Sequence, residues 1–131
     1  TVARNEHALA SSVAHDSHNI VAVGTDDAAL SAAVNAVIEA QGGISATNGA
    51  GDTRVLALPI AGLMSAGDGY ELARSYAQLD QWVKETLPCS LKAPFMTLSF
   101  LALPVIPVLK MTDLGLFDVE IFDFTPVEVK S

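Results

Sequence analysis

The spacing of apolar side chains predicts two amphipathic helices in this chain. Between residues 28 and 41, apolar residues recur at helical spacing with no intervening proline, and the same pattern returns between residues 69 and 87. Asp26 and Asp68 stand just before these segments, where an aspartate can accept hydrogen bonds from the first N–H groups of a helix. A pair of glycines follows the first segment and Pro88 follows the second, so both helices have a defined end.

Other apolar stretches have the length and composition of β-strands. Residues 19–24 form a short continuous run rich in valine, which predicts a strand buried on both faces. Residues 44–47 and 53–58 flank a loop of Asn and Gly, which favours a β-hairpin. Residues 95–103 fit either a buried strand or a short buried helix, and the alternation in residues 119–124 predicts an edge strand.

Taken in order, these elements predict an α+β fold. The two main helices are expected to cover one face of a small mixed sheet, which gives a two-layer sandwich. A length of 131 residues fits a single domain, residues 1–131. Because 50% of the residues are hydrophobic, the chain can bury a core, and intrinsic disorder is excluded as its main state.

Charge and cysteine content narrow the function classes. With 7 basic against 15 acidic side chains and a net charge of −8, the chain lacks the basic surface that nucleic-acid binding requires. The most apolar stretch, residues 95–109, contains Pro104 and Pro107 and is shorter than the roughly 20 residues that a membrane-spanning helix needs. The single cysteine, Cys89, favours a reducing compartment. We therefore expect a soluble cytoplasmic protein whose partners include neither nucleic acid nor membrane.

The densest polar cluster, the His/Asp cluster, comes just before the first predicted strand and contains His15, Asp16, His18 and Asn19. Imidazole and carboxylate groups can transfer protons or bind divalent metals. These four residues are therefore candidates for contact with a substrate, and His15, Asp16 and His18 are weaker candidates for a metal. In an extended backbone His15 points away from Asp16 and His18, so the three converge only if the chain turns. A third interpretation is a tight surface or interface turn, stabilised by Asp16, Ser17 and Asn19.

Other chemically interesting residues favour structural roles. Cys89 has no histidine near it in sequence to activate a thiolate, so we expect it to be partly buried and structural. Lys92 and Thr97 belong either to a loop that leads into the core or to the edge of a pocket. Asp26 and Asp27 fit a helix cap better than an acid–base pair. The methionines are expected to fill the core; they are Met64, Met96 and Met111.

Four segments of the chain resemble a known family. They are residues 10–25 (ASSVAHDSHNIVAVGT), 58–65 (LPIAGLMS), 91–107 (LKAPFMTLSFLALPVIP) and 110–119 (KMTDLGLFDV). These segments are similar to the C-terminal domain of bacterial and archaeal adenine deaminases, members of the amidohydrolase superfamily. The similarity extends from about residue 8 to residue 124, which is nearly the whole chain.

The resemblance implies a part in the hydrolysis of adenine to hypoxanthine and ammonia. In that family the chemistry belongs to a TIM-type barrel, where manganese or iron activates a water molecule. A barrel takes about 250 residues, so it is expected elsewhere in the same polypeptide, and this chain alone is expected to be inactive and to bind no metal tightly. The resemblance also implies that the His/Asp cluster faces the barrel mouth and helps to close the purine pocket, with Thr97 or Ser99 further away.

Two alternatives remain from the sequence. One is a structural or interaction module, in which an apolar face within residues 58–64 or 95–109 is covered by a partner or by a second copy, giving a homo-oligomer. The other is a small ligand- or metal-binding domain that acts alone and has no catalytic activity.

Overall fold

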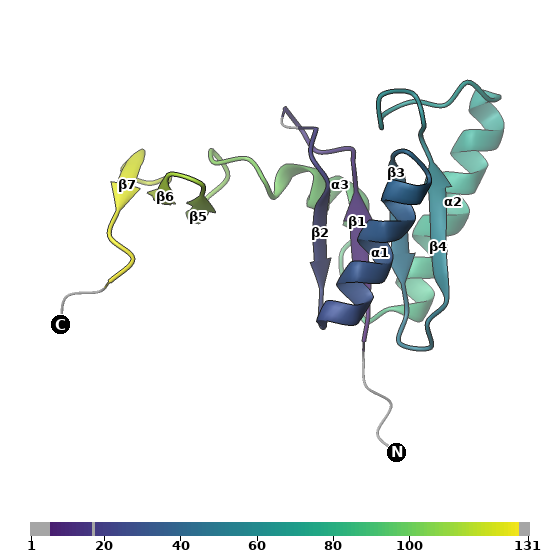
Figure 1. Ribbon diagram of the computed structural model, residues 1–131, viewed down its shortest axis with the longest axis horizontal. Helices are drawn as coiled ribbons and strands as arrows, with labels where there is room; N and C mark the ends of the chain where they lie inside the picture. The colour runs from purple at the N-terminus through teal and green to yellow at the C-terminus, as the bar shows by residue number, and fades with distance from the viewer. Residues whose placement is uncertain (1–5, 17, 129–131) are drawn as a thin grey trace, which may run out of the picture.

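The computed structural model describes residues 6–16 and 18–128 (Figure 1). It has a main body, residues 6–100, and a separate C-terminal sheet. The elements in chain order are β1 (Ala8–Ser11), β2 (Val21–Gly24), α1 (Asp27–Glu39), β3 (Gly43–Thr47), β4 (Thr53–Ala57), α2 (Gly69–Thr86), α3 (Pro94–Phe100), β5 (Leu109–Thr112), β6 (Gly115–Asp118) and β7 (Asp123–Thr125).

A four-stranded sheet with the order β2-β1-β3-β4 forms the centre of the body. Each of its strand pairings is antiparallel, so the sheet is not mixed as expected. The middle strands β1 and β3 are buried along their whole length, whereas the edge strands β2 and β4 are partly exposed. The expected order lacked β1, which lies between β2 and β3 and runs antiparallel to both.

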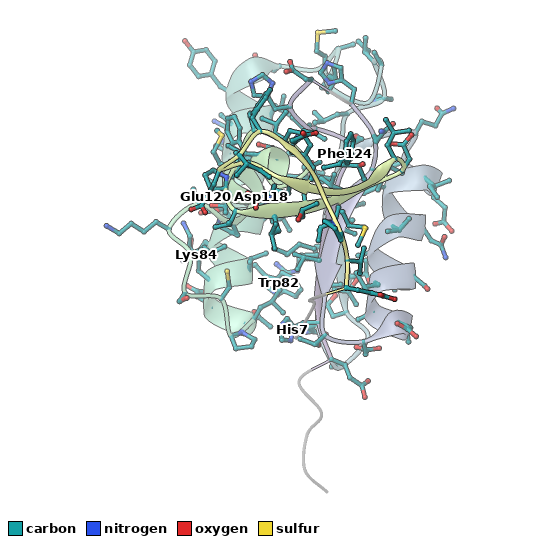
Figure 2. All side chains as sticks on the ribbon, turned by 90° about the vertical axis from the view of Figure 1, so that its left-hand side faces the viewer. His7, Trp82, Lys84, Asp118, Glu120 and Phe124 are labelled. Atoms are coloured by element: carbon teal, nitrogen blue, oxygen red, sulfur yellow. The ribbon has the colours of Figure 1, made fainter. Side chains whose placement is uncertain are left out.

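The helices α1 and α2 lie on opposite faces of this sheet, as Figure 2 shows. On one face, Ala8 and Ala10 of β1 belong to a cluster with Ala33 and Val37 of α1. The α+β sandwich prediction is confirmed, but the two main helices do not share one face, so helix, sheet and helix form three layers. Successive side chains of a strand point to opposite faces, and β1 and β3 are apolar or small on both, so each face needs a covering helix. The second face carries a larger cluster: Leu9, Ile44, Ala46, Leu79, Val83, Leu87, Phe95 and Leu98.

Both main helices begin at the predicted caps. Asp26 Oδ1 accepts hydrogen bonds from the N–H groups of Ala28 and Ala29 at 2.9 and 3.0 Å. Asp68 Oδ1 accepts the equivalent pair from the first turn of α2, both at 3.0 Å. The carboxylates satisfy N–H groups that have no partner within the helix, which confirms that Asp26 is a structural cap.

The strand predictions are confirmed in part. The predicted hairpin is present as β3 and β4. Residues 19–24 contain β2, but this strand lies at the sheet edge and is partly exposed, and residues 95–103 contain a helix, α3. The edge strand predicted at residues 119–124 is confirmed only at its end, where Asp123 and Phe124 belong to the edge strand β7; residues 119–122 form the turn between β6 and β7 instead. Exposed apolar side chains in that turn reproduce the alternation of a strand.

The methionines do not fill the core. Met64, Met96 and Met111 are 54%, 58% and 68% exposed. Met64 lies in the loop before α2, Met96 in α3 and Met111 in β5. The expectation from residue type is therefore wrong, because the apolar side chains of these segments extend beyond the layers that cover the body.

The strands β5, β6 and β7 form a second antiparallel sheet, which we call the C-terminal arm (residues 109–125). Figure 1 shows the arm extending away from the body, to which residues 101–108 connect it. Within the described part of the chain, no helix has the length and apolar character needed to cross a membrane.

Candidate functional site in the loop between β1 and β2

The His/Asp cluster lies in the loop that joins β1 to β2, and Ser12 anchors the start of this loop. The Ser12 side chain is buried and lies beside the start of β3. Its Oγ accepts a hydrogen bond from the Gly43 N–H at 2.8 Å and donates to the Gly62 carbonyl at 2.6 Å. The Ser12 N–H also donates to the Gly43 carbonyl at 2.9 Å. One side chain therefore connects the loop to two other segments of the body.

This anchor depends on glycines that let the backbones approach closely. Gly42 has φ +118°, and a Cβ there would stand 2.3 Å from Gly62 Cα. Gly43 has φ +139°, and a Cβ there would stand 2.1 Å from the Leu56 carbonyl oxygen. L-residues rarely adopt such φ values, and the space is too small for any side chain. The glycine pair that predicted a helix end thus also supports the loop.

The backbone and ring of His15 are both held by α3. The His15 N–H donates to the Ser99 carbonyl at 2.8 Å. The imidazole meets the Phe100 ring edge to face, with centroids 5.1 Å apart and an interplanar angle of 75°. Aromatic pairs favour this geometry over parallel stacking. The ring is therefore oriented by tertiary contacts although half of its side-chain surface is exposed.

Asp16 completes a polar pair with His15. The His15 Nδ1 and Asp16 Oδ1 atoms are 3.2 Å apart, and the two side chains are 50% and 79% exposed. A carboxylate at Nδ1 favours the imidazole tautomer with its N–H at that nitrogen, which leaves Nε2 to accept a hydrogen bond from a ligand. The pair can therefore form hydrogen bonds with a polar ligand.

Two of the described residues of the loop lie in the left-handed region. Asp16 has φ +63° and His18 has φ +50°. A non-glycine residue there costs about 1 kcal/mol or more, and such positions are often found at functional sites. The His18 N–H donates to the Ala14 carbonyl at 3.1 Å, which closes the turn. The sequence required the backbone to turn here if the side chains of the His/Asp cluster were to converge, and the structure contains such a turn.

The turn brings His15 and Asp16 together but not the whole cluster. His18 and Asn19 are exposed, and no hydrogen bond or ion pair between described residues joins their side chains to the His15–Asp16 pair. No three His, Cys, Asp or Glu side chains in the described ranges lie close enough to hold a metal ion. Ser17, one of the three predicted turn residues, lies outside the described residues.

The more distant candidates make local contacts. Thr97 is exposed and its Oγ1 donates to the Ala93 carbonyl at 2.9 Å, while Ser99 is buried and its Oγ donates to the Met96 carbonyl at 2.7 Å. Lys92 is exposed. Cys89 is partly buried against the core, as expected for a structural residue.

Sequence reasoning missed the two residues that position His15 and its loop. Ser12 belongs to the polar stretch of the sequence, but its role depends on Gly43 and Gly62, which are 31 and 50 residues away. Phe100 gives no local signal, because its contact with His15 exists only once α3 packs beside β1.

An apolar cavity of about 460 Å³ adjoins the loop. It is lined by residues of the sheet, α2, α3 and the adjoining loops, among them Val13, Tyr76 and Ser99. Burial raises the pKa of the Tyr76 phenol; the Asp80 carboxylate adds to the rise and Lys84 opposes it. Since Ser99 also binds the His15 backbone, the cavity and the loop share a wall.

Comparison with known proteins yields one family. A family model described as the adenine deaminase C-terminal domain matches residues 2–123. An adenine deaminase of Sulfurovum sp. (strain NBC37-1) is 58% identical over 117 residues, which is 89% of this chain and 22% of that protein. An adenine deaminase of Salinibacter ruber is 60% identical over 117 residues, 89% of this chain and 21% of that protein. One of Methanothermobacter thermautotrophicus is 52% identical over 118 residues, 90% of this chain and 22% of that protein. The chain thus spans about a fifth of the length of these relatives.

Proposed function

The chain belongs to the adenine deaminase C-terminal domain family, and from this premise we propose that it is part of an enzyme that hydrolyses adenine to hypoxanthine and ammonia. The catalytic barrel, of the amidohydrolase type, belongs to the same polypeptide and binds the purine. The relatives support the proposal, because they carry this name and are about five times as long as the segment that matches. A cytoplasmic location is part of the proposal and is supported by the single cysteine.

We assign the catalytic metal, manganese or iron, to the barrel. When bound, such a metal lowers the pKa of a water molecule and supplies the nucleophile. The residues of this chain do not fit that role, since no three ligand side chains converge among the described residues. The His15–Asp16 pair alone offers too few ligands, because a catalytic metal site needs about three from the protein. The chain therefore contributes contacts and not the metal centre.

The observation that carries a role in the reaction is the geometry of His15. Its ring is oriented by Phe100 and Asp16, yet half of its side-chain surface remains exposed, and among the described residues no hydrogen bond occupies Nε2. Adenine presents ring nitrogens and an amino group along its edge, and these match a positioned imidazole. We propose that the loop closes the purine pocket, with His15 and Asp16 in contact with the substrate and His18 and Asn19 at its rim.

The experiment is steady-state kinetics on the full-length enzyme that carries this segment. His15→Ala and Asp16→Ala are each expected to lower kcat/KM about 10- to 100-fold, the effect of losing a charged hydrogen bond. His7→Ala is the matched control, because His7 directly precedes β1 while His15 follows it, at the other end of the strand. Unfolding midpoints should match wild type in all three variants. Unchanged kinetics in both loop variants would contradict the substrate contact.

The apolar cavity supports a second candidate, a free-standing module that binds an apolar ligand. The size of the natural polypeptide separates the two functions. A protein several times larger than 13.7 kDa supports the deaminase, whereas one of about that mass supports the module.

A further inference from the structure

The C-terminal arm exposes apolar side chains on both of its faces. The register pairs Met111 with Leu116 on one face, and it places Phe117 beside Phe124 on the other. Met111 is 68% exposed and Phe124 is 47% exposed. Phe117 meets the Phe124 ring edge to face with centroids 5.5 Å apart, so the aromatic side chains of this face contact each other. Figure 1 shows the arm standing away from the layers of the body.

A sheet of this kind is incomplete by itself. Small sheets gain their stability from an apolar face packed on another layer, and contiguous exposed apolar surface commonly indicates an interface. The turns of the arm add further apolar surface, with Leu114 at 78%, Ile121 at 65% and Phe122 at 67% exposure. The outer strands β5 and β7 also present open edges among the described residues, which proteins usually cover.

The length of the relatives indicates what covers the arm. The chain matches about a fifth of each relative, and the family is described as a C-terminal domain, so most of such a polypeptide precedes this segment. We propose that both faces of the arm pack against that preceding part of the same polypeptide. The inference rests on the proposed function for the existence of the longer protein, but it concerns docking and not catalysis.

Charge predicts the chemistry of the docking partner. Acidic residues border the apolar faces of the arm, and Asp118 and Glu120 lie together on one side in Figure 2, apart from Phe124. Asp113 and Asp123 add to this border, whereas Lys110 is the basic residue of β5. The complementary surface is therefore an apolar strip bordered by lysine or arginine side chains.

Hydrogen–deuterium exchange tests the docking. The 131-residue chain and the full-length polypeptide are compared without substrate, at concentrations well below any self-association. Amides of residues 109–125 are expected to exchange at least about 10-fold more slowly in the full-length protein. Amides of β3 (Gly43–Thr47), which are buried in the body, should show the same rate in both. Equal rates for the arm in both proteins would overturn the proposal. Slow exchange in the short chain that depends on its concentration would also overturn it, because a second copy would then cover the arm.

Variants of the full-length protein locate the contact. Met111→Ser and Phe124→Ser each remove apolar surface from a different face of the arm. Each is expected to speed exchange in residues 109–125 by at least about 10-fold. The control is Ile38→Ser, which removes a side chain that is 57% exposed on α1. The docking would be contradicted if the exchange rate of residues 109–125 stayed at the wild-type value in both arm variants. It would also be contradicted if Ile38→Ser raised that rate as much as they do. Because no step uses activity, an inactive protein with a protected arm would refute the proposed function and leave the docking intact.

Discussion

The two sheets of this chain have the same pairing but opposite surroundings. Both are antiparallel and consist of short strands, yet β3 in the body is buried throughout whereas β6 in the arm is only partly buried throughout. The body sheet has α1 on one face and α2 with α3 on the other. The arm has no comparable layer among the described residues. Burial of a strand here depends on the covering layers and not on the strand itself.

The strand sequences make the same point. β1 reads ALAS and is fully buried, while β6 reads GLFD and is not, although β6 carries the larger apolar side chains. Alanine suits β1 because α1 packs closely against it. The bulky side chains of β6 indicate a partner that lies beyond this segment, in line with the proposed docking.

The largest expected effect comes from the backbone of the body. Gly42→Ala would place a Cβ 2.3 Å from Gly62 Cα at a φ of +118°. Neither backbone can move without breaking the contacts of Ser12, so the variant is expected to lose at least about 3 kcal/mol of unfolding free energy. Urea denaturation of the 131-residue chain, followed by circular dichroism, measures this loss.

Gly51→Ala is the matched control for that substitution. Gly51 also has a positive φ of +80°, but a Cβ there would meet nothing within 4 Å. Only the conformational strain remains, which costs about 1–2 kcal/mol. If both variants lost the same free energy of unfolding, the close approach of Gly42 and Gly62 would make no contribution to stability.

A second comparison sets one side chain of the body against one of the arm. Val83 on α2 is fully buried, and Val83→Ala is expected to cost about 2–3 kcal/mol through lost burial and a cavity. Phe124→Ala removes a larger side chain, but in the 131-residue chain it should cost less than about 1 kcal/mol, because Phe124 is 47% exposed. The same denaturation assay measures both. A larger loss at Phe124 would mean that the arm is already covered within the chain.

The smallest expected effect is on the pH dependence of stability. Burial raises the pKa of Tyr76 above its ordinary value of 10.0. The unfolded chain therefore loses the phenol proton first, so this contribution is complete below pH 10 and is lost as the pH rises through the higher folded pKa. Urea midpoints measured from pH 9 to 11 should fall less steeply for Tyr76→Phe than for wild type. For Tyr70→Phe, the urea midpoint should fall with pH as steeply as in wild type, because Tyr70 is 81% exposed. Equal slopes for all three would contradict the effect.

Local signals in the sequence were sufficient for the helices, their caps and the hairpin. Apolar spacing located α1 and α2, and Asp26 and Asp68 located their first turns, because each signal acts within a few residues. β1 was missed because alanine and serine are not typical of strands, and its burial comes from layers formed by distant residues. The placement of the helices on opposite faces was missed for the same reason.

The sequence predicted which segment holds the candidate site, but it did not predict the contacts that shape the site. The composition of the loop indicated the correct segment, and the pairing of His15 with Asp16 follows from a left-handed turn that composition alone does not specify. The contact of His15 with Phe100 and the anchor at Ser12 depend on residues far away in the chain. Only the folded body brings these groups together.

The anchoring of the loop has a consequence for the order of folding. Ser12 binds partners 31 and 50 residues away, so its hydrogen bonds require β3 and the segment around Gly62 to be in place already. Closing such long loops costs conformational entropy, which is offset only when the distant contacts form. This contact is therefore expected late on the folding pathway. Substitutions that remove the Ser12 hydroxyl should then accelerate unfolding and leave the folding rate nearly unchanged. The part of the body proposed to meet the substrate would be the last to acquire its structure and the first to lose it.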